Sequence, residues 1–138
     1  MTAIEAGTEL PPLQRAVTLT DMVAYAGATW DWHRLHYDPG YLAERGLSAP
    51  VVDGQMLAAL LAEQAQDALG PSAFLRRLQF RFRNLVFAGE TVRCTARVTA
   101  CEGLADGTAL VTLAASVGVV GADARVAVAP AHLEVHVR

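Results

Sequence analysis

The chain has 138 residues, of which 53% are hydrophobic and 18% charged, and its formal net charge is −3. This length and composition exclude a disordered chain and predict one folded domain over residues 1–138. All 11 basic residues are arginine, which excludes catalysis through a lysine Schiff base. The net negative charge argues against a nucleic-acid partner.

The sequence also disfavours membrane and secreted proteins. No stretch approaches the roughly 18 uncharged apolar residues of a membrane helix, and the first residues lack the basic region of a secretory signal. The two cysteines are too few for a disulfide framework. We therefore expect a cytoplasmic protein with no membrane partner.

The first part of the chain predicts an arm, a short strand and a helix. Residues 1–12 end in two prolines and predict a loosely ordered N-terminal arm. Residues 16–19 predict a short strand. Thr20 is a favourable N-cap for a helix that runs to about Trp30.

Two more helices follow. Asp38 and the proline after it begin a short helix that Gly46 ends. The clearest helix covers residues 54–69, with Asp53 as its N-cap. This helix is apolar on nearly every side, which predicts that it is buried.

The rest of the chain predicts β-strands separated by turns rich in glycine and aspartate. Several segments alternate polar and apolar residues, as strands with one buried face do. The predicted strands cover residues 77–83, 91–101, 110–120, 125–128 and 133–137. We expect an α+β fold in which a curved antiparallel sheet of about five strands wraps around the central buried helix.

Residues 31–38 contain the densest cluster of side chains that can exchange protons or bind ligands. If the first helix continued, Asp31 and His36 would lie about 140° apart and their side chains could not converge. A helix that ends near Trp30 leaves a turn that brings both side chains to one point. We expect no metal site in this segment, because no cysteine supports one.

This segment resembles a known motif. Asp31, four intervening residues and His36, with Asp38 two positions on, are similar to the hydratase motif of the MaoC-like hot-dog proteins, the (R)-specific enoyl-CoA hydratases and acyl dehydratases. The similarity extends over residues 15 to 137 and includes Ala43, Gly46, the run from Ala49 to Val52, Gly54, Phe80 to Phe82, and Val86 to Glu90. A single hot-dog domain is the fold that this resemblance implies.

The resemblance implies addition of water to a 2-enoyl thioester, or the reverse dehydration of a (3R)-hydroxyacyl thioester. Asp31 and His36 would hold one water and share the acid and base roles. The backbone N–H of Gly54 would bind the thioester carbonyl at the positive end of the helix. No cofactor is implied beyond the coenzyme A or phosphopantetheine that carries the acyl group.

The chain departs from the family pattern at two places. His33-Arg34 stands where Asn-Pro is usual, which resembles hydratase subunits of actinobacterial steroid side-chain degradation, some of which work as heteromers. Asp53 stands where His is usual. An aspartate there either caps the helix or points at the thioester carbonyl and opposes catalysis.

An arginine-rich strand face supplies further candidates for substrate binding. Its arginines would either hold the phosphates of the acyl carrier or be solvated. The candidate substrate-binding residues are His33, Asp53, Gln55, Arg77, Arg81 and Arg83.

Other functions stay open. The chain could be a non-catalytic or half-site hot-dog subunit, a hot-dog thioesterase that uses Glu63 or Asp67, or a related enzyme repurposed in secondary metabolism. Bare edge strands predict a homodimer, or a heteromer with a second MaoC-like chain. Small residues on the long helix predict room for a long or bulky acyl group; they are Ala58, Ala59 and Ala62.

Overall fold

The computed structural model describes residues 4–138 as five strands and several helices. In chain order these are β1 (Leu13–Ala16), α1 (Leu19–Thr29), a short 3-10 helix η1 (Arg34–His36), α2 (Pro39–Glu44), α3 (Gly54–Leu69), β2 (Phe74–Phe82), β3 (Thr91–Gly103), β4 (Ala109–Val120) and β5 (Arg125–Val137). The strands form one antiparallel sheet in the order β1-β3-β4-β5-β2. The predicted α+β class and five-stranded sheet are confirmed.

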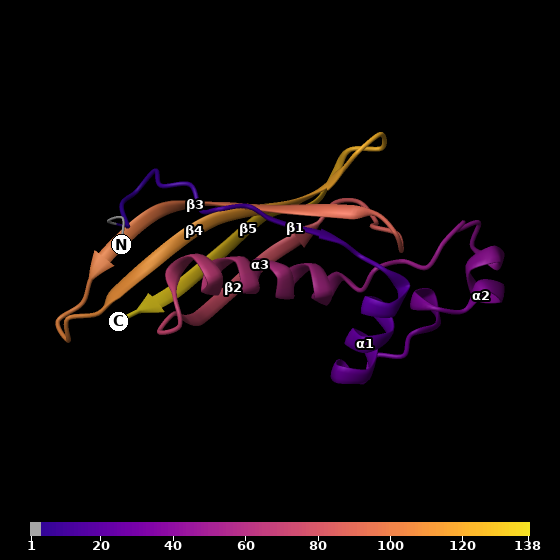
Figure 1. Cartoon of the computed structure of the whole chain (residues 1–138), viewed down its shortest axis with the longest axis horizontal. Helices are drawn as coiled ribbons and strands as arrows, with labels where there is room; N and C mark the ends of the chain where they lie inside the picture. Colours follow the sequence, from indigo (N-terminus) through magenta and orange to yellow (C-terminus); the bar gives the residue numbers. More distant parts are fainter. Residues whose placement is uncertain (1–3) are drawn as a thin grey trace.

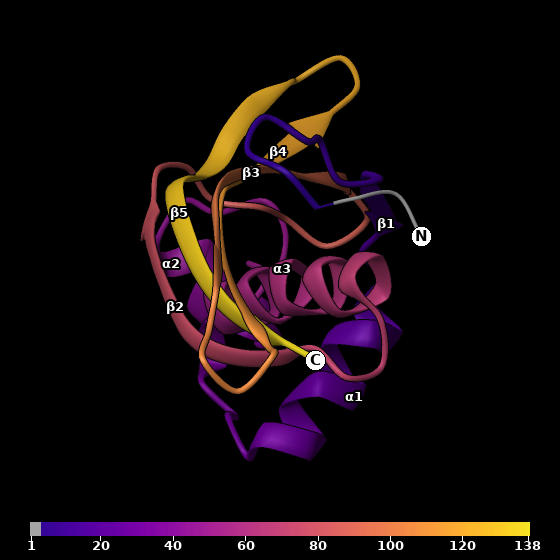
Figure 2. The same cartoon turned by 90° about the vertical axis from the view of Figure 1, so that its left-hand side faces the viewer.

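The sheet curves around α3, which lies along its concave face (Figures 1 and 2). α1 and α2 lie at one end of the molecule, beyond the start of α3 (Figure 1). This arrangement places the N-terminus of the central helix next to the segment that follows α1. The candidate site is built there.

Alternation along β3 shows how the sheet and helix form a core. Val92, Cys94, Ala96 and Val98 are buried, and the residues between them are exposed. The four buried side chains belong to the same hydrophobic cluster as Leu61 of α3. Burying one aliphatic side chain of this size stabilises a fold by about 1.5–3 kcal/mol, so the wrapping of the sheet is driven by contact with the helix.

α1 begins earlier than the sequence predicts. Its N-cap is Thr18 rather than Thr20, because Thr18 and Asp21 cap each other. The Oγ1 atom of Thr18 accepts the N–H of Asp21 at 3.1 Å, and the carboxylate of Asp21 accepts the N–H of Thr18 at 2.8 Å. The short strand shifts in the same direction, from the predicted residues 16–19 to β1.

The N-terminal segment differs from the predicted loose arm over the residues that the structure describes. Leu10 is buried, and its N–H donates to the carbonyl of Ala96 on β3 at 2.8 Å. The carbonyl of Pro11 accepts a hydrogen bond from the side-chain amide of Gln64 on α3 at 2.9 Å. These bonds fasten the segment to the sheet and the central helix; the first three residues of the predicted arm lie outside the described residues.

The last two predicted strands, 125–128 and 133–137, are parts of the single strand β5. Pro130 lies between them and has no N–H to give to the ladder, which is why the sequence predicts a break. The strand instead continues through an irregularity in its pairing with β4, between Ala115 and Val117.

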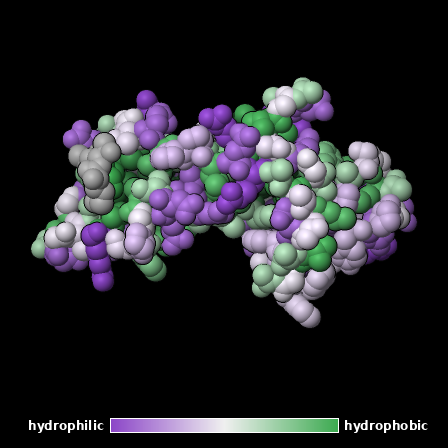
Figure 3. Space-filling model, in the orientation of Figure 1, coloured by the Kyte–Doolittle hydropathy of each residue, from purple (hydrophilic) through white to green (hydrophobic). Residues whose placement is uncertain are grey.

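The surface is mixed in character. Figure 3 shows hydrophilic residues gathered across the middle of one face, with hydrophobic residues interspersed toward both ends. Within residues 4–138, none of the helices has the length and apolar character needed to cross a membrane.

Candidate active site

The end of α1 determines where the candidate site begins. The helix stops at Thr29, and Trp30 follows in the left-handed region with φ of 60°. This reversal ends the helix directly before Asp31. η1 then positions His36, so the helix end that the sequence predicts near Trp30 is confirmed.

Asp31, His36 and Asp53 converge next to the start of α3. One carboxylate oxygen from each aspartate and one ring nitrogen of His36 lie within 4.8 Å of one another. The three side chains border a cavity of about 10 Å³. This volume is close to what one water molecule needs. A water in this cavity would lie between the three side chains.

Among the described residues, two carboxylates and no arginine line the cavity. Tyr25 also lines it; burial, followed by the charges of Asp53 and Asp31, raises the pKa of its phenol. Tyr25 is therefore a neutral hydroxyl near neutral pH. Two carboxylates and an imidazole form a donor set that divalent ions accept, so these are the described residues able to hold a metal. The sequence-based expectation that none is used stays a prediction.

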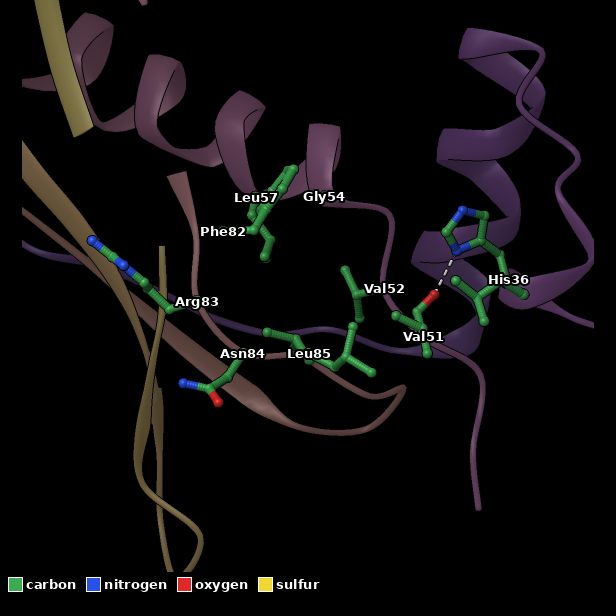
Figure 4. Close-up of a pocket in the computed structure, with 11 residues that line it drawn as sticks. His36, Val51, Val52, Gly54, Leu57, Phe82, Arg83, Asn84 and Leu85 are labelled. Carbon is green, nitrogen blue, oxygen red and sulfur yellow. Dashed lines mark hydrogen bonds between the residues drawn. The ribbon is translucent and has the colours of Figure 1, made fainter. Parts of the chain in front are cut away.

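A main-chain hydrogen bond orients His36 (Figure 4). Its Nδ1 lies 2.6 Å from the carbonyl oxygen of Val51. A carbonyl only accepts, so Nδ1 carries the hydrogen and donates it. The neutral ring then has an unprotonated Nε2, which is able to take a proton from a bound molecule.

The start of α3 offers a hydrogen-bond donor. Asp53 caps the helix, with its Oδ1 accepting the N–H of Gln55 at 2.8 Å, which favours the capping alternative for this residue. Gly54 follows as the first helical residue, and its N–H has no partner among residues 4–138. An unpaired N–H at the positive end of a 16-residue helix is suited to an oxygen that gains negative charge.

An open groove of about 300 Å³ begins beside this donor. His36 and Gly54 lie along it, and its other walls are mainly apolar (Figure 4). The main apolar contributors are Leu35, Val51, Val52, Leu57, Phe82 and Leu85. Apolar clefts with a few convergent polar groups are the usual form of small-molecule sites. The alanines predicted to make room for the acyl group, Ala58, Ala59 and Ala62, do not line this groove.

Of the six predicted substrate-binding residues, Arg83 alone lines the groove. His33 and Gln55 are exposed, and neither lines it. The Nδ1 of His33 instead accepts the N–H of Leu35 at 3.1 Å. The ring of His33 therefore caps η1 and lies edge-on to Tyr41, whereas Gln55 contributes its backbone N–H to the cap of α3.

The predicted arginine face is divided between two environments. Arg77 forms an exposed ion pair with Glu134, at 3.7 Å. Arg81 and Arg83 border a polar depression of about 480 Å³ that also includes His132. Arg83 lines the apolar groove as well. Of the three predicted arginines, Arg83 is therefore nearest to the groove.

Asp38, which follows the motif, has a structural position. Its carboxylate caps α2 by accepting the N–H of Tyr41 at 3.0 Å and also accepts the Nε–H of Arg34 at 2.8 Å. The N–H of Tyr41 and then the guanidinium of Arg34 lower the pKa of this carboxyl group. Asp38 holds the loop in shape and leaves the cavity to Asp31 and Asp53.

Sequence analysis missed Val51, Phe82 and Tyr25 as members of the site. Val51 contributes a main-chain carbonyl, for which no side-chain signal exists. Phe82 reaches the site because of the way β2 passes the start of α3. Tyr25 shares a helical face with Met22, and both line the cavity, so helical spacing was a usable signal.

Comparisons with known proteins give the family. The model of the MaoC-like domain matches residues 3–123. The chain belongs to the MaoC-like domain family. It is 28% identical, over 89 residues, to the (R)-specific enoyl-CoA hydratase of Aeromonas caviae. That match covers 64% of this chain and 66% of the relative, slightly less than two thirds of its length.

Solved structures match the whole fold. The ChsH1-ChsH2 complex of Mycobacterium tuberculosis contains a chain 27% identical to this one, with a TM-score of 0.81 and full coverage of both chains. The (R)-hydratase of A. caviae involved in PHA biosynthesis is 24% identical, with a TM-score of 0.85 and 100% coverage of both. These matches confirm the hot-dog fold that the resemblance implies.

Proposed function

We propose that this MaoC-like chain hydrates a 2-enoyl thioester, or dehydrates the corresponding 3-hydroxyacyl thioester, with Asp31 and His36 as its acid-base pair. The observation that carries the proposal is their convergence on a cavity sized for one water, beside an apolar groove. Hydration needs a held water, a group to accept its proton, a group to protonate C2 and a donor for the carbonyl oxygen. The site offers a candidate for each.

In the proposed reaction, the water loses a proton to one member of the pair as its oxygen attacks C3. The electron pair of the C2=C3 bond moves toward the thioester, and the carbonyl oxygen gains negative charge beside the Gly54 N–H. The imidazolium of His36, whose charge the Asp31 carboxylate stabilises, then returns this proton to C2, so that the pair ends in its starting protonation state. Because Nδ1 of His36 is committed to Val51, Nε2 is suited to accept the first proton. Similarity to an (R)-specific hydratase supports a (3R)-hydroxyacyl product.

The proposed substrate is an acyl thioester of coenzyme A or of a phosphopantetheine carrier. Arg81 and Arg83 border the depression next to the groove, which supports a role in holding the carrier's phosphates. Asp53 caps α3 and completes the wall around the water. The proposal uses no metal or other cofactor.

The thioesterase alternative has less support. A thioesterase of this fold would use an acid on α3 facing the thioester. Glu63 is paired with Arg15 instead, and Asp67 is exposed; neither lines the groove.

We propose that a second hot-dog subunit covers the edge of β2. This strand pairs with β5 on one side only, and Phe74 and Phe82 on it are 67% and 56% exposed. Edge strands of this length are normally covered. The match to a chain of the ChsH1-ChsH2 complex supports a homologous second chain as the alternative to a second copy. Light scattering of the purified protein tests this, and a monomer both alone and with a co-expressed MaoC-like chain would contradict it.

The loss of enoyl absorbance on mixing the protein with 2-enoyl-CoA tests the hydratase proposal. We expect turnover by the native protein, with and without a chelator, and a fall of about 10²-fold or more in Asp31→Asn. Asp67→Asn removes an exposed carboxylate of α3 and serves as the matched control. Turnover that survives in Asp31→Asn would refute the mechanism, and a chelator-sensitive reaction would refute its independence from metals.

A further inference from the structure

The cavity between Asp31, His36 and Asp53 is bordered mostly by groups that accept hydrogen bonds. Carboxylates accept and, when ionised, do not donate. Because Nδ1 of His36 donates to the carbonyl of Val51, Nε2 of the neutral ring is also an acceptor. A water molecule has two hydrogens to give and also accepts through its oxygen. The three groups therefore compete for the hydrogens of a bound water, and none of them donates to its oxygen.

Tyr25 supplies the donor that this set lacks. It lines the same cavity, and the other described residues that line it are two methionines and an alanine, whose side chains have no N–H or O–H. Burial, followed by the charges of Asp53 and Asp31, raises the pKa of the phenol, so the hydroxyl keeps its hydrogen near neutral pH. Within residues 4–138 the phenol makes no hydrogen bond. Its O–H is therefore available to a molecule bound in the cavity.

The position of Tyr25 in the fold keeps this donor in place when the protein assembles. Tyr25 belongs to α1 and also borders a second hollow, of about 430 Å³, between α1, β1 and α3. In the strand order, β1 is the edge of the sheet opposite β2. A second subunit on the edge of β2 therefore leaves the side of the cavity formed by Tyr25 unchanged.

We propose that Tyr25 is a third catalytic residue, which donates a hydrogen bond to the oxygen atom that adds to C3. This bond occupies one lone pair of the oxygen and leaves the other to attack the acyl group in the groove. The inference rests on the proposed function, since it takes a water in the cavity as the nucleophile.

Tyr25 keeps its own proton throughout the proposed reaction. In hydration, an O–H bond of the water breaks as its proton moves to Nε2 of His36, and the oxygen forms its bond to C3. The oxygen gains negative charge as the proton leaves, so the hydrogen bond from Tyr25 strengthens in the transition state. In dehydration the C3–O bond breaks, the imidazolium of His36 gives its proton to the departing oxygen, and Tyr25 stabilises that oxygen as it leaves.

The test compares Tyr25→Phe, which removes the hydroxyl and keeps the ring, with Tyr37→Phe. Tyr37 is 47% exposed and lines neither the cavity nor the groove. We expect kcat for the hydration of 2-enoyl-CoA to fall about 10- to 100-fold in Tyr25→Phe and to stay native in Tyr37→Phe. Butyryl-CoA is saturated and cannot be hydrated, so calorimetry measures its binding without turnover. Its Kd should be the same in the native protein and both variants.

A second measurement separates donation from packing. Asp53→Asn replaces a carboxylate oxygen with an amide NH₂ group, which donates, and keeps an oxygen for the N–H of Gln55. We therefore expect Tyr25→Phe to lower kcat by a smaller factor in the Asp53→Asn background, because the asparagine supplies a donor to the cavity. An equal factor in the two backgrounds would overturn the role of the Tyr25 hydroxyl as a donor.

The remaining outcomes are also decisive. Native kcat in Tyr25→Phe, an equal fall in Tyr37→Phe, or a loss of butyryl-CoA affinity as large as the loss of kcat would overturn the donor role and leave the hydratase proposal in place. Absence of turnover in the native protein would instead refute the proposed function, and the role of Tyr25 with it.

Discussion

Nδ1 of His36 donates a hydrogen bond to the carbonyl of Val51, 2.6 Å away, and so connects the turn after α1 to the segment that leads into α3. The same bond fixes the tautomer of the ring and leaves Nε2 available as a base. One hydrogen bond therefore fixes both the orientation of the proposed base and the position of the segment that precedes α3. A side chain that keeps this bond but lacks Nε2 separates the two roles.

His36→Asn is such a change. The asparagine amide is able to donate to Val51 as Nδ1 does, but nothing replaces Nε2. We expect kcat/KM for 2-enoyl-CoA to fall by about 10²- to 10⁴-fold, with the circular dichroism spectrum and melting temperature close to those of the native protein. Native-like turnover in a folded His36→Asn protein would exclude His36 from the acid-base pair.

Most of the fold could be predicted because its signals are local. Alternation over residues 91–101 marks β3, and the all-round apolar character of residues 54–69 marks the buried helix. The sequence offers two threonines as the N-cap of α1. Thr18 caps the helix in place of the predicted Thr20 because Thr18 and Asp21 form reciprocal hydrogen bonds. The sequence predicts a break at Pro130. The strand continues because its pairing with β4 is irregular at this point, and a pattern within one strand cannot show the register of its partner.

The site could be predicted where its residues are close in sequence. Asp31 and His36 share one turn, so their convergence follows once the helix ends at Trp30. The approach of Phe82 to Gly54 depends on the path of β2 past α3, which no local pattern contains. The ion pair of Arg77 could not be predicted for the same reason, because its partner Glu134 is on another strand.

Asp53 gives a test of helix capping at the site. Asparagine caps a helix about as well as aspartate, whereas alanine does not. We expect Asp53→Asn to keep the native free energy of unfolding and Asp53→Ala to lose about 1 kcal/mol, both measured by urea denaturation. An equal loss in the two variants would mean that the charge of Asp53, rather than its bond to the Gln55 N–H, stabilises the start of α3.

The ion pair of Glu90 and Arg125 gives a pH dependence. Arg125 donates to both carboxylate oxygens of Glu90, at 2.6 and 2.9 Å, and also to the carbonyl of Leu85 on the groove. The hydrogen bonds from Arg125, opposed by burial and aided by the Phe87 N–H, lower the pKa of Glu90 below its usual 4.5. A lowered native pKa means that the stabilisation is complete above 4.5 and is lost as the pH falls through the native value.

We therefore expect the free energy of unfolding to decline below about pH 5, with a smaller decline in Glu90→Gln. Urea denaturation at a series of pH values measures this. Glu102→Gln changes an exposed glutamate near the end of β3 and should leave the decline as it is in the native protein. Parallel pH profiles for Glu90→Gln and the native protein would show that this pair contributes nothing to acid stability.

The two cysteines differ in the reactivity that the fold allows them. Cys94 is fully buried in the core, and burial, followed by the charge of Glu63, raises the pKa of its thiol to about 12, whereas Cys101 is exposed. Thiolates are the reactive species, so we expect one thiol to react with Ellman's reagent at pH 8 in the folded protein and two in denaturant. Cys101→Ser should leave the folded protein unreactive. Rapid reaction of Cys94 in that folded variant would place it outside the core.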